Sequence, residues 1–148
     1  MTLGAAIRTR LIADAAIAAA VSDRIFPVQG LPVDKDTVVP DHIVYSQESE
    51  ATMDAISGGG SLAVQSVYSF ESVCDPRLAS ATSPYDRCDA ISLLIQDSLH
   101  GYNETAGLMG GVGGVQVMSV EQIDRQDTID ILTGLFVKSQ TFKFTWRR

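Results

Sequence analysis

The segment Thr141-Phe142-Lys143-Phe144-Thr145-Trp146-Arg147, TFKFTWR in one-letter code, alternates polar and aromatic side chains without interruption. Successive side chains of a β-strand point to opposite faces of a sheet, so the three aromatic rings share one face. A strand of this kind has one face in the core and the other toward solvent. The segment therefore predicts a sheet that helices cover on one side only.

Four other segments have the composition of β-strands. The clearest covers residues 62–73, where apolar side chains such as Val64 and Tyr68 alternate with polar ones. Shorter strands are predicted at residues 24–28, 42–46 and 115–123. The first of these stops at a proline, as edge strands often do.

The N-terminal segment is predicted to form one helix over residues 2–20, with the threonine at its start as the cap. Leu3, Ile7 and Leu11 recur every four residues and place an apolar stripe along this helix. Asp14 is expected on its solvent side. The many alanines of the segment favour close packing against a sheet.

A second helix is predicted to start at Ser83, whose hydroxyl can accept a hydrogen bond from a free amide of the first turn. Pro84 suits the first helical position, and Asp86 can return the capping bond. Gly101 is expected to end the helix just after His100. The apolar face of this helix contains Tyr85, Cys88, Ile91, Leu94, Ile95 and Leu99.

The order of elements is thus helix, three strands, helix, two strands. This order predicts an α+β fold with a single, mostly antiparallel sheet and two helices packed on one face. A chain of 148 residues is short enough to form one domain, 1–148. Its 45% hydrophobic residues are sufficient for a core without disulfides.

The net charge of −7 argues against a role in reading nucleic-acid sequence, because the chain repels phosphates at long range. It is compatible with a protein past which DNA slides without binding. Cys74 and Cys88 are too few for a disulfide framework and indicate assembly in a reducing compartment. No segment has the roughly 18 apolar residues of a membrane span, so we expect no membrane partner.

The glycine-rich run over residues 107–114 resembles a phosphate-binding loop only superficially. Such a loop follows a strand, precedes a helix and includes a lysine. Here a helix comes before the run, a strand comes after it, and the run has no lysine. We expect a flexible connection, not a nucleotide site.

Other motifs do not assemble an active site. Ser61 lies in a G-x-S-x-A segment but opens a predicted strand, whereas a nucleophile elbow leads from a strand into a helix. His42 and His100 lack the spacing of metal ligands, and Cys88 is expected in the core. We expect no catalytic residue, no metal and no cofactor. A glycosidase-like pair among the many carboxylates stays open as an alternative.

Two acidic segments, residues 47–61 and 124–134, are predicted to be loops. A loop as long as the first, without structure of its own, is often functional. Acidic side chains in loops are more often solvated than catalytic. The six acids of the two segments are Glu48, Glu50, Asp54, Asp124, Asp127 and Asp130.

The order of these parts resembles a known family. An alanine-rich helix leads into the motif V-x-D-R-I-F-P at residues 21–27, and a strand follows at 43–46. A long loop, the strand at 62–70, a capped helix starting at Tyr85-Asp86 and the aromatic last strand complete the pattern. This layout is similar to the tail-completion or tail-terminator (head–tail joining) proteins of long-tailed bacteriophages and gene-transfer particles. The resemblance covers nearly the whole chain.

The resemblance implies a structural protein of the virion, not an enzyme. Members of this family are thought to form a six-fold ring on the finished tail tube, which stops tube polymerisation and offers a surface to the head connector. The expected partners are copies of the chain itself, the tail tube protein and the neck protein of the connector, with DNA passing through unbound. The expected place is the tail neck, after assembly in the host cytoplasm.

Two hypotheses follow, one for the two flexible segments and one for the six acids. Residues 47–61 and 107–114 would order on docking, and the six acids would dock partners or face the lumen of the ring. Two alternatives stay open: another neck role, such as a head-closure or stopper protein, and a small hydrolase or ligand-binding α+β domain that uses its acids or Ser61.

Overall fold

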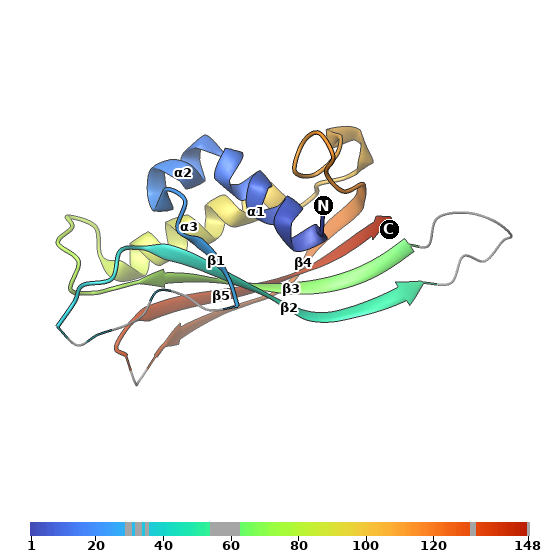
Figure 1. Cartoon of the computed structure of the whole chain (residues 1–148). Helices are drawn as coiled ribbons and strands as arrows, with labels where there is room; N and C mark the ends of the chain where they lie inside the picture. Colours follow the sequence, from blue (N-terminus) through green and yellow to red (C-terminus); the bar gives the residue numbers. More distant parts are fainter. Residues whose placement is uncertain (29–30, 32–33, 35, 54–62, 131–132, 148) are drawn as a thin grey trace, which may run out of the picture.

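The computed structural model of the protein describes residues 1–28, 31, 34, 36–53, 63–130 and 133–147. Three helices, α1 (Leu3–Ala13), α2 (Ala15–Val21) and α3 (Pro84–Leu99), lie together on one face of a five-stranded sheet (Figure 1). A turn of 3-10 helix, η1 (Glu104–Ala106), follows α3. In the part of the chain that the structure describes, no helix covers the opposite face of the sheet.

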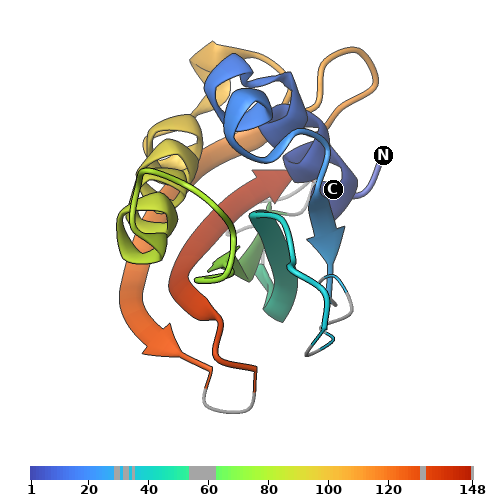
Figure 2. The same ribbon diagram turned by 90° about the vertical axis from the view of Figure 1, so that its left-hand side faces the viewer.

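The strands of the sheet are arranged in the order β1-β2-β3-β5-β4. They are β1 (Ile25–Pro27), β2 (His42–Met53), β3 (Ala63–Cys74), β4 (Val117–Ile129) and β5 (Phe136–Arg147). The pairing of β1 with β2 is parallel, and the other three pairings are antiparallel. The predicted α+β fold, with one mostly antiparallel sheet under a layer of helices, is confirmed, and Figure 2 shows the two layers from one end.

The aromatic side chains of the last strand lie in the core, as the alternation predicts. Phe142 and Phe144 are fully buried, and Trp146 is almost so. The Phe142 ring meets Phe70 of β3 edge to face, with 5.6 Å between the centroids. The Trp146 indole donates to the Ser66 hydroxyl at 3.0 Å, which satisfies its polar atom. Burial of each ring stabilises the fold by roughly 1.5–3 kcal/mol.

The N-terminal segment is not one helix, so the prediction over residues 2–20 is wrong. Asp14 has extended backbone angles (φ −76°, ψ 114°) and separates α1 from α2. Its carboxylate accepts hydrogen bonds from the amides of Ala16 at 3.0 Å and Ile17 at 3.4 Å. Its own amide donates to the Leu11 carbonyl and ends α1. An aspartate satisfies free amides at a helix start better than it fits a helix interior, which explains the break.

Helix α3 begins as predicted. The Ser83 hydroxyl accepts from the Asp86 amide at 3.1 Å and donates to the Asp86 carboxylate at 2.8 Å. Gly101, with φ of 78°, follows the last turn. Most of the predicted apolar face is buried, but Tyr85 at its start is 49% exposed.

Two strands are longer than predicted. β2 continues to Met53 and β4 to Ile129, so residues 47–53 and 124–129 belong to strands and not to loops. The neighbouring strands β3 and β5 supply hydrogen-bond partners along this whole length. Backbone pairing therefore outweighs the low strand propensity of the acidic residues.

The glycine run at residues 107–114, predicted as a flexible connection, lies between α3 and β4 and has a defined geometry. Met109 and Val115 form a bridge through two backbone hydrogen bonds of 2.9 Å. The Met109 side chain is fully buried and anchors the loop to the core. Four of the five glycines in the run adopt positive φ. Glycine is thus needed here for a tight loop.

Candidate functional site

The face of the sheet away from the helices, called here the open face, has no helix over it among the residues that the structure describes. It consists of the odd-numbered residues of β3 and β5, their register partners in β2 and β4, and Glu48 at a bulge of β2. Its centre is rich in hydroxyl groups, including Ser69, Ser139 and Thr141. At one end it has a small apolar cluster, which consists of Val44, Val73, Leu135 and Val137.

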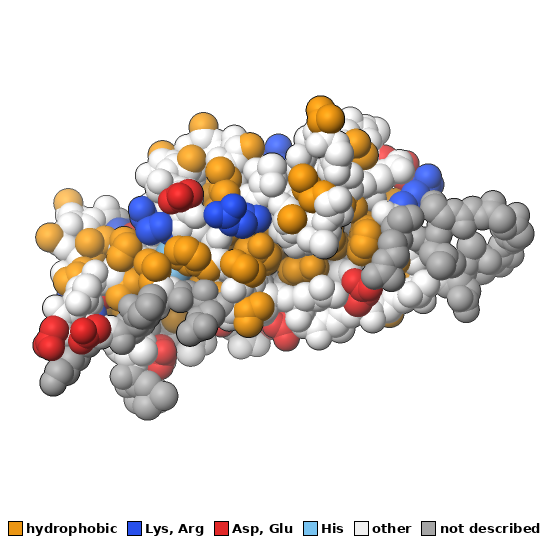
Figure 3. Space-filling view, viewed as in Figure 1, with side chains coloured by type: hydrophobic (Ala, Val, Ile, Leu, Met, Phe, Trp, Pro, Cys, Tyr) orange, Lys and Arg blue, Asp and Glu red, His pale blue; other side chains and the backbone are white. Residues whose placement is uncertain are grey.

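The charged side chains of the open face are mainly acidic. Its acids are Glu48, Glu71, Glu121 and Asp124, and its bases are Lys143 and Arg147. Both bases contact acids: Lys143 lies 2.8 Å from Glu121, and Arg147 lies 3.6 Å from Glu104. In Figure 3, basic side chains gather over the helical layer while most acidic ones lie along the sheet and its loops.

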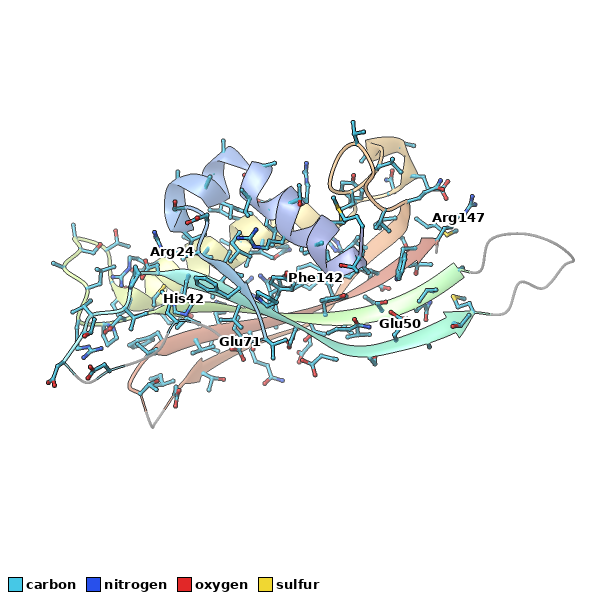
Figure 4. All side chains as sticks on the ribbon, in the orientation of Figure 1. Arg24, His42, Glu50, Glu71, Phe142 and Arg147 are labelled. Carbon is cyan, nitrogen blue, oxygen red and sulfur yellow. The ribbon has the colours of Figure 1, made fainter. Side chains whose placement is uncertain are left out.

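A carboxylate on the open face is held by neighbouring hydroxyls. Glu48 accepts from the Ser69 hydroxyl at 2.6 Å and from the Ser46 hydroxyl at 3.0 Å. These two bonds lower the pKa of Glu48. Glu71 projects from the sheet away from the helices (Figure 4). Its pKa is raised, first by partial burial and then by the nearby charges of Glu48 and Asp130.

The six predicted acids do not form one site. Among those in described strands, Glu48 and Asp124 lie on the open face. Glu50 and Asp127 lie on the helix-covered side, because their register partners Ser66 and Lys138 are buried there. Asp130 follows the end of β4. The last of the six, Asp54, lies outside the described residues.

Asp127 belongs to a cluster of ions beneath the start of α3. Lys138 of β5 contacts the carboxylates of Asp89 on α3 and of Asp127, the latter at 3.0 Å. Arg125 of β4 lies 2.8 Å from the same Asp89 carboxylate. Burial lowers the pKa of Lys138, but its hydrogen bonds to the two carboxylates outweigh this effect and the pKa is raised. The charges are therefore compensated within the cluster, as a structural role requires.

The same region has a hollow of about 470 Å³, lined mainly by apolar side chains. Its walls include Tyr85, Cys88, Ile129 and Phe136, with Lys138 and Asp127 at one side. The Tyr85 hydroxyl donates to Asp127 at 3.3 Å, and the Lys138 ammonium lies 5.4 Å from the Tyr85 ring centroid. Because these polar groups already contact one another, the hollow suits an apolar side chain better than a polar substrate.

The histidines have structural contacts. His42 is buried, its Nδ1 lies 2.9 Å from the Pro40 carbonyl, and burial is the main cause of its lowered pKa. His100 Nδ1 accepts from the Gln122 amide at 3.2 Å. Among the described residues, no three His, Cys, Asp or Glu side chains are grouped as metal ligands. Within the same residues, no helix is long and apolar enough to cross a membrane.

Sequence reasoning missed the cluster around Lys138. The signal was present in β5, where the inward positions continue backward from Phe142 through Gln140 to Lys138. Two polar residues at inward positions of an amphipathic strand predict buried partners, because unpaired polar groups are costly in a core. Gln140 does have such a partner: its amide donates to the Ser92 carbonyl at 3.0 Å.

Of three comparisons with known proteins, the one with solved structures gives matches. No protein-family model matches the chain, and no curated protein sequence is similar to it. Among solved structures, a chain described as "Virion of native gene transfer agent (GTA) particle" superposes with a TM-score of 0.65. The match covers 99% of this chain and 95% of that chain at 14% sequence identity. At this identity the likeness shows a shared fold.

Proposed function

We propose that the chain is a structural virion protein that ends a phage-type tail. In this role it forms a ring on the finished tail tube, stops further polymerisation and presents a surface to the head connector. The observation that carries the proposal is the full-length structural match to a chain of a gene transfer agent particle. The V-x-D-R-I-F-P motif at residues 21–27 supports the same reading through its resemblance to tail terminators.

The distribution of charge supports a place around a DNA channel. Glu48, Glu71 and Asp124 on the open face repel phosphate, and the two bases of this face already contact acids. A wall of this kind lets DNA slide instead of holding it. We therefore propose that the open face is directed toward the lumen, with Glu48 and Asp124 among the residues that line it.

The proposed function requires no bond-making chemistry. Within the described residues, the ionic groups of the Lys138 cluster compensate one another, and the hollow beside them is mainly apolar. We propose that the protein acts by shape and self-association, with the tail tube protein and the connector as its partners. A ring of identical subunits needs two different surfaces on each chain that fit one another.

Electron microscopy of the purified protein mixed with tail tubes tests this function. We expect a ring at one end of each tube and no further growth when tube subunits are added. A matched sample without the protein provides the control and should continue to elongate. Tubes that stay uncapped and keep growing in the presence of the chain would contradict the proposal, as would its location outside the neck of an intact particle.

A further inference from the structure

The two cysteines of the chain lie close together, one at the end of β3 and the other near the start of α3. We propose that Cys74 and Cys88 are a reactive thiol pair, which hydrogen peroxide converts into a disulfide with Cys88 as the thiol that reacts first. The site is distinct from the open face, and the inference does not depend on the proposed ring.

Both cysteines belong to the core between the sheet and the helices. Cys74 is the last residue of β3 and is fully buried, and Cys88 of α3 is 3% exposed. Both side chains are part of the hydrophobic cluster on the helix-covered side of the sheet. Neither forms a disulfide in the structure, so both are available as thiols.

The position of the Cys88 sulfur brings it to Cys74. This sulfur lies 3.2 Å from the Ser72 carbonyl oxygen and 3.3 Å from the Phe136 carbonyl oxygen. Phe136 is the register partner of Cys74 across the β3–β5 ladder, and Ser72 is the preceding inward residue of β3. The Cys88 sulfur therefore lies over the two backbone positions that border Cys74.

Two further observations agree with this contact. The Arg87 guanidinium donates to the Asp75 carbonyl at 2.9 Å, so the residues next to the two cysteines also meet. The pKa of the Cys74 thiol is raised, first by its hydrogen bond with Cys88 and then by burial. The two sulfur atoms are thus neighbours, and a disulfide between them needs little movement of the backbone.

The environment of each thiol assigns the order of reaction. A thiolate, not a thiol, attacks a peroxide, so the raised pKa makes Cys74 a poor first nucleophile at neutral pH. Cys88 lines the hollow of about 470 Å³ beside the start of α3, and Cys74 is not among the described residues of its walls. Hydrogen peroxide is little larger than water, which occupies about 30 Å³ in the liquid, so the hollow has ample room for it.

A buried hydroxyl of a residue beside Cys88 lacks a partner in the reduced chain. Ser72 is fully buried, and its hydroxyl has no hydrogen-bond partner among the described residues. An unpaired polar group is costly in a core, and a redox role is one reason for which such a group is retained. A sulfenic oxygen on Cys88 is placed to supply the missing acceptor, because the Cys88 sulfur lies against the carbonyl of the same serine.

Two steps balance the reaction. The Cys88 sulfur, having lost its proton, attacks one oxygen of hydrogen peroxide; an S–O bond forms, the O–O bond breaks, and the leaving hydroxide takes that proton and departs as water. The Cys74 sulfur then attacks the Cys88 sulfur of this sulfenic acid; the S–S bond forms, the S–O bond breaks, and the hydroxyl leaves as a second water with the Cys74 proton. The pair loses two electrons, and one peroxide accepts them.

The disulfide closes residues 75–87 into a loop between the end of β3 and α3. A cross-link over a segment of this length stabilises a protein, mainly by restricting the unfolded chain. For a chain of this size we expect the melting temperature to rise by about 5–10 °C. The pair is therefore a site at which oxidation strengthens the attachment of α3 to the sheet.

Peroxide treatment of the folded full-length chain tests the pair. The intact mass should fall by about 2 Da, because two thiol hydrogens are lost. Peptide mapping without reductant should show Cys74 joined to Cys88, and dithiothreitol should restore both thiols and the original melting temperature. A chain with Val112→Cys provides the reference for an ordinary surface thiol, because Val112 is fully exposed.

Two serine variants separate the roles of the thiols. Cys74→Ser leaves Cys88 without its partner, so its sulfenic acid should persist, and dimedone added together with denaturant should label it. Cys88→Ser is the matched control and should give no dimedone adduct, because Cys74 is not among the described residues that line the hollow. Circular dichroism before treatment checks that both variants are folded. An adduct on Cys74 in Cys88→Ser would overturn the order of reaction.

Two other results would overturn the pairing itself. One is the persistence of both native thiols after the thiol introduced by Val112→Cys is fully oxidised. The other is a sulfinic or sulfonic acid on Cys88 with no link to Cys74. Both results are read from the native cysteines, so neither depends on the folding of the serine variants.

Discussion

The ammonium of Lys138 lies 3.0 Å from the carboxylate of Asp127 and also contacts Asp89, so that one cation joins β5 to β4 and to α3. Lys138 is 7% exposed, and its ammonium lies 5.4 Å from the centroid of the Tyr85 ring. The contacts of Lys138 thus tie the end of the β4–β5 hairpin to α3. Without them, backbone pairing would be the main link between the two strands at this end of the sheet.

Replacing this lysine should destabilise the fold. Lys138→Met keeps much of the stem but removes the cation that Asp127 contacts and leaves Asp89 with Arg125 alone. Because both acids are partly exposed, the expected loss in the free energy of unfolding is moderate, about 1–2 kcal/mol. Urea denaturation followed by circular dichroism measures it. Lys143→Met removes only the exposed pair with Glu121, which solvent screens, and should lower the free energy of unfolding clearly less than Lys138→Met does.

Glu71 should make stability depend on pH with an unusual sign. Its pKa is raised in the folded chain, mainly by partial burial, so the ionised form is less favourable there than in the unfolded chain. The resulting penalty is present above the folded pKa and disappears as the pH falls below the unfolded value of about 4.3. Glu71→Gln should therefore stabilise the protein at pH 7 and have little effect near pH 4.

Denaturation curves at the two pH values distinguish this effect from a general change in packing. Glu121→Gln is the matched control on the same face. The hydrogen bond and charge of Lys143 lower the pKa of Glu121. The Glu121 carboxylate therefore stabilises the folded chain at pH 7, and this stabilisation is lost as the pH falls through the folded pKa. Equal effects of Glu71→Gln at both pH values would show that ionisation is not the cause.

Asp14 should contribute as a cap and not as a surface charge. Asp14→Ala removes the acceptor of the Ala16 and Ile17 amides at the start of α2 and should cost about 1 kcal/mol. Asp14→Asn keeps an oxygen in the same place and should retain most of the stability. Thermal unfolding of the two variants at low ionic strength compares them; equal losses would indicate that the negative charge is what matters.

The loop at residues 107–114 should tolerate alanine at one glycine and not at its neighbour. A Cβ on Gly114 would lie 2.1 Å from the Met109 carbonyl oxygen, so Gly114→Ala has to open the Met109–Val115 bridge. We expect a loss of about 2–4 kcal/mol. Gly113 has open space around it and a φ of 76°, so Gly113→Ala should cost only about 1–2 kcal/mol. The free energy of unfolding of both variants checks the difference.

The local parts of the fold were determined by sequence alone. Phe142, Phe144 and Trp146 alternate with polar residues, and this period of two requires a strand with one buried face whatever the rest of the chain does. Ser83 and Gly101 mark the ends of α3, because a hydroxyl cap and a positive φ are properties of single residues and their immediate neighbours.

Only the tertiary structure decided where the acidic segments go. Glu50 and Asp127 are poor strand formers, yet both lie in strands because β3 and β5 offer a backbone partner at every position. Which face each acid joins depends further on the bulges at Glu48 and Ile123, since one extra residue reverses the alternation after it. Strand pairing and bulges depend on residues that are distant in the chain. The local sequence pattern around an acid therefore does not predict which strand or which face that acid joins.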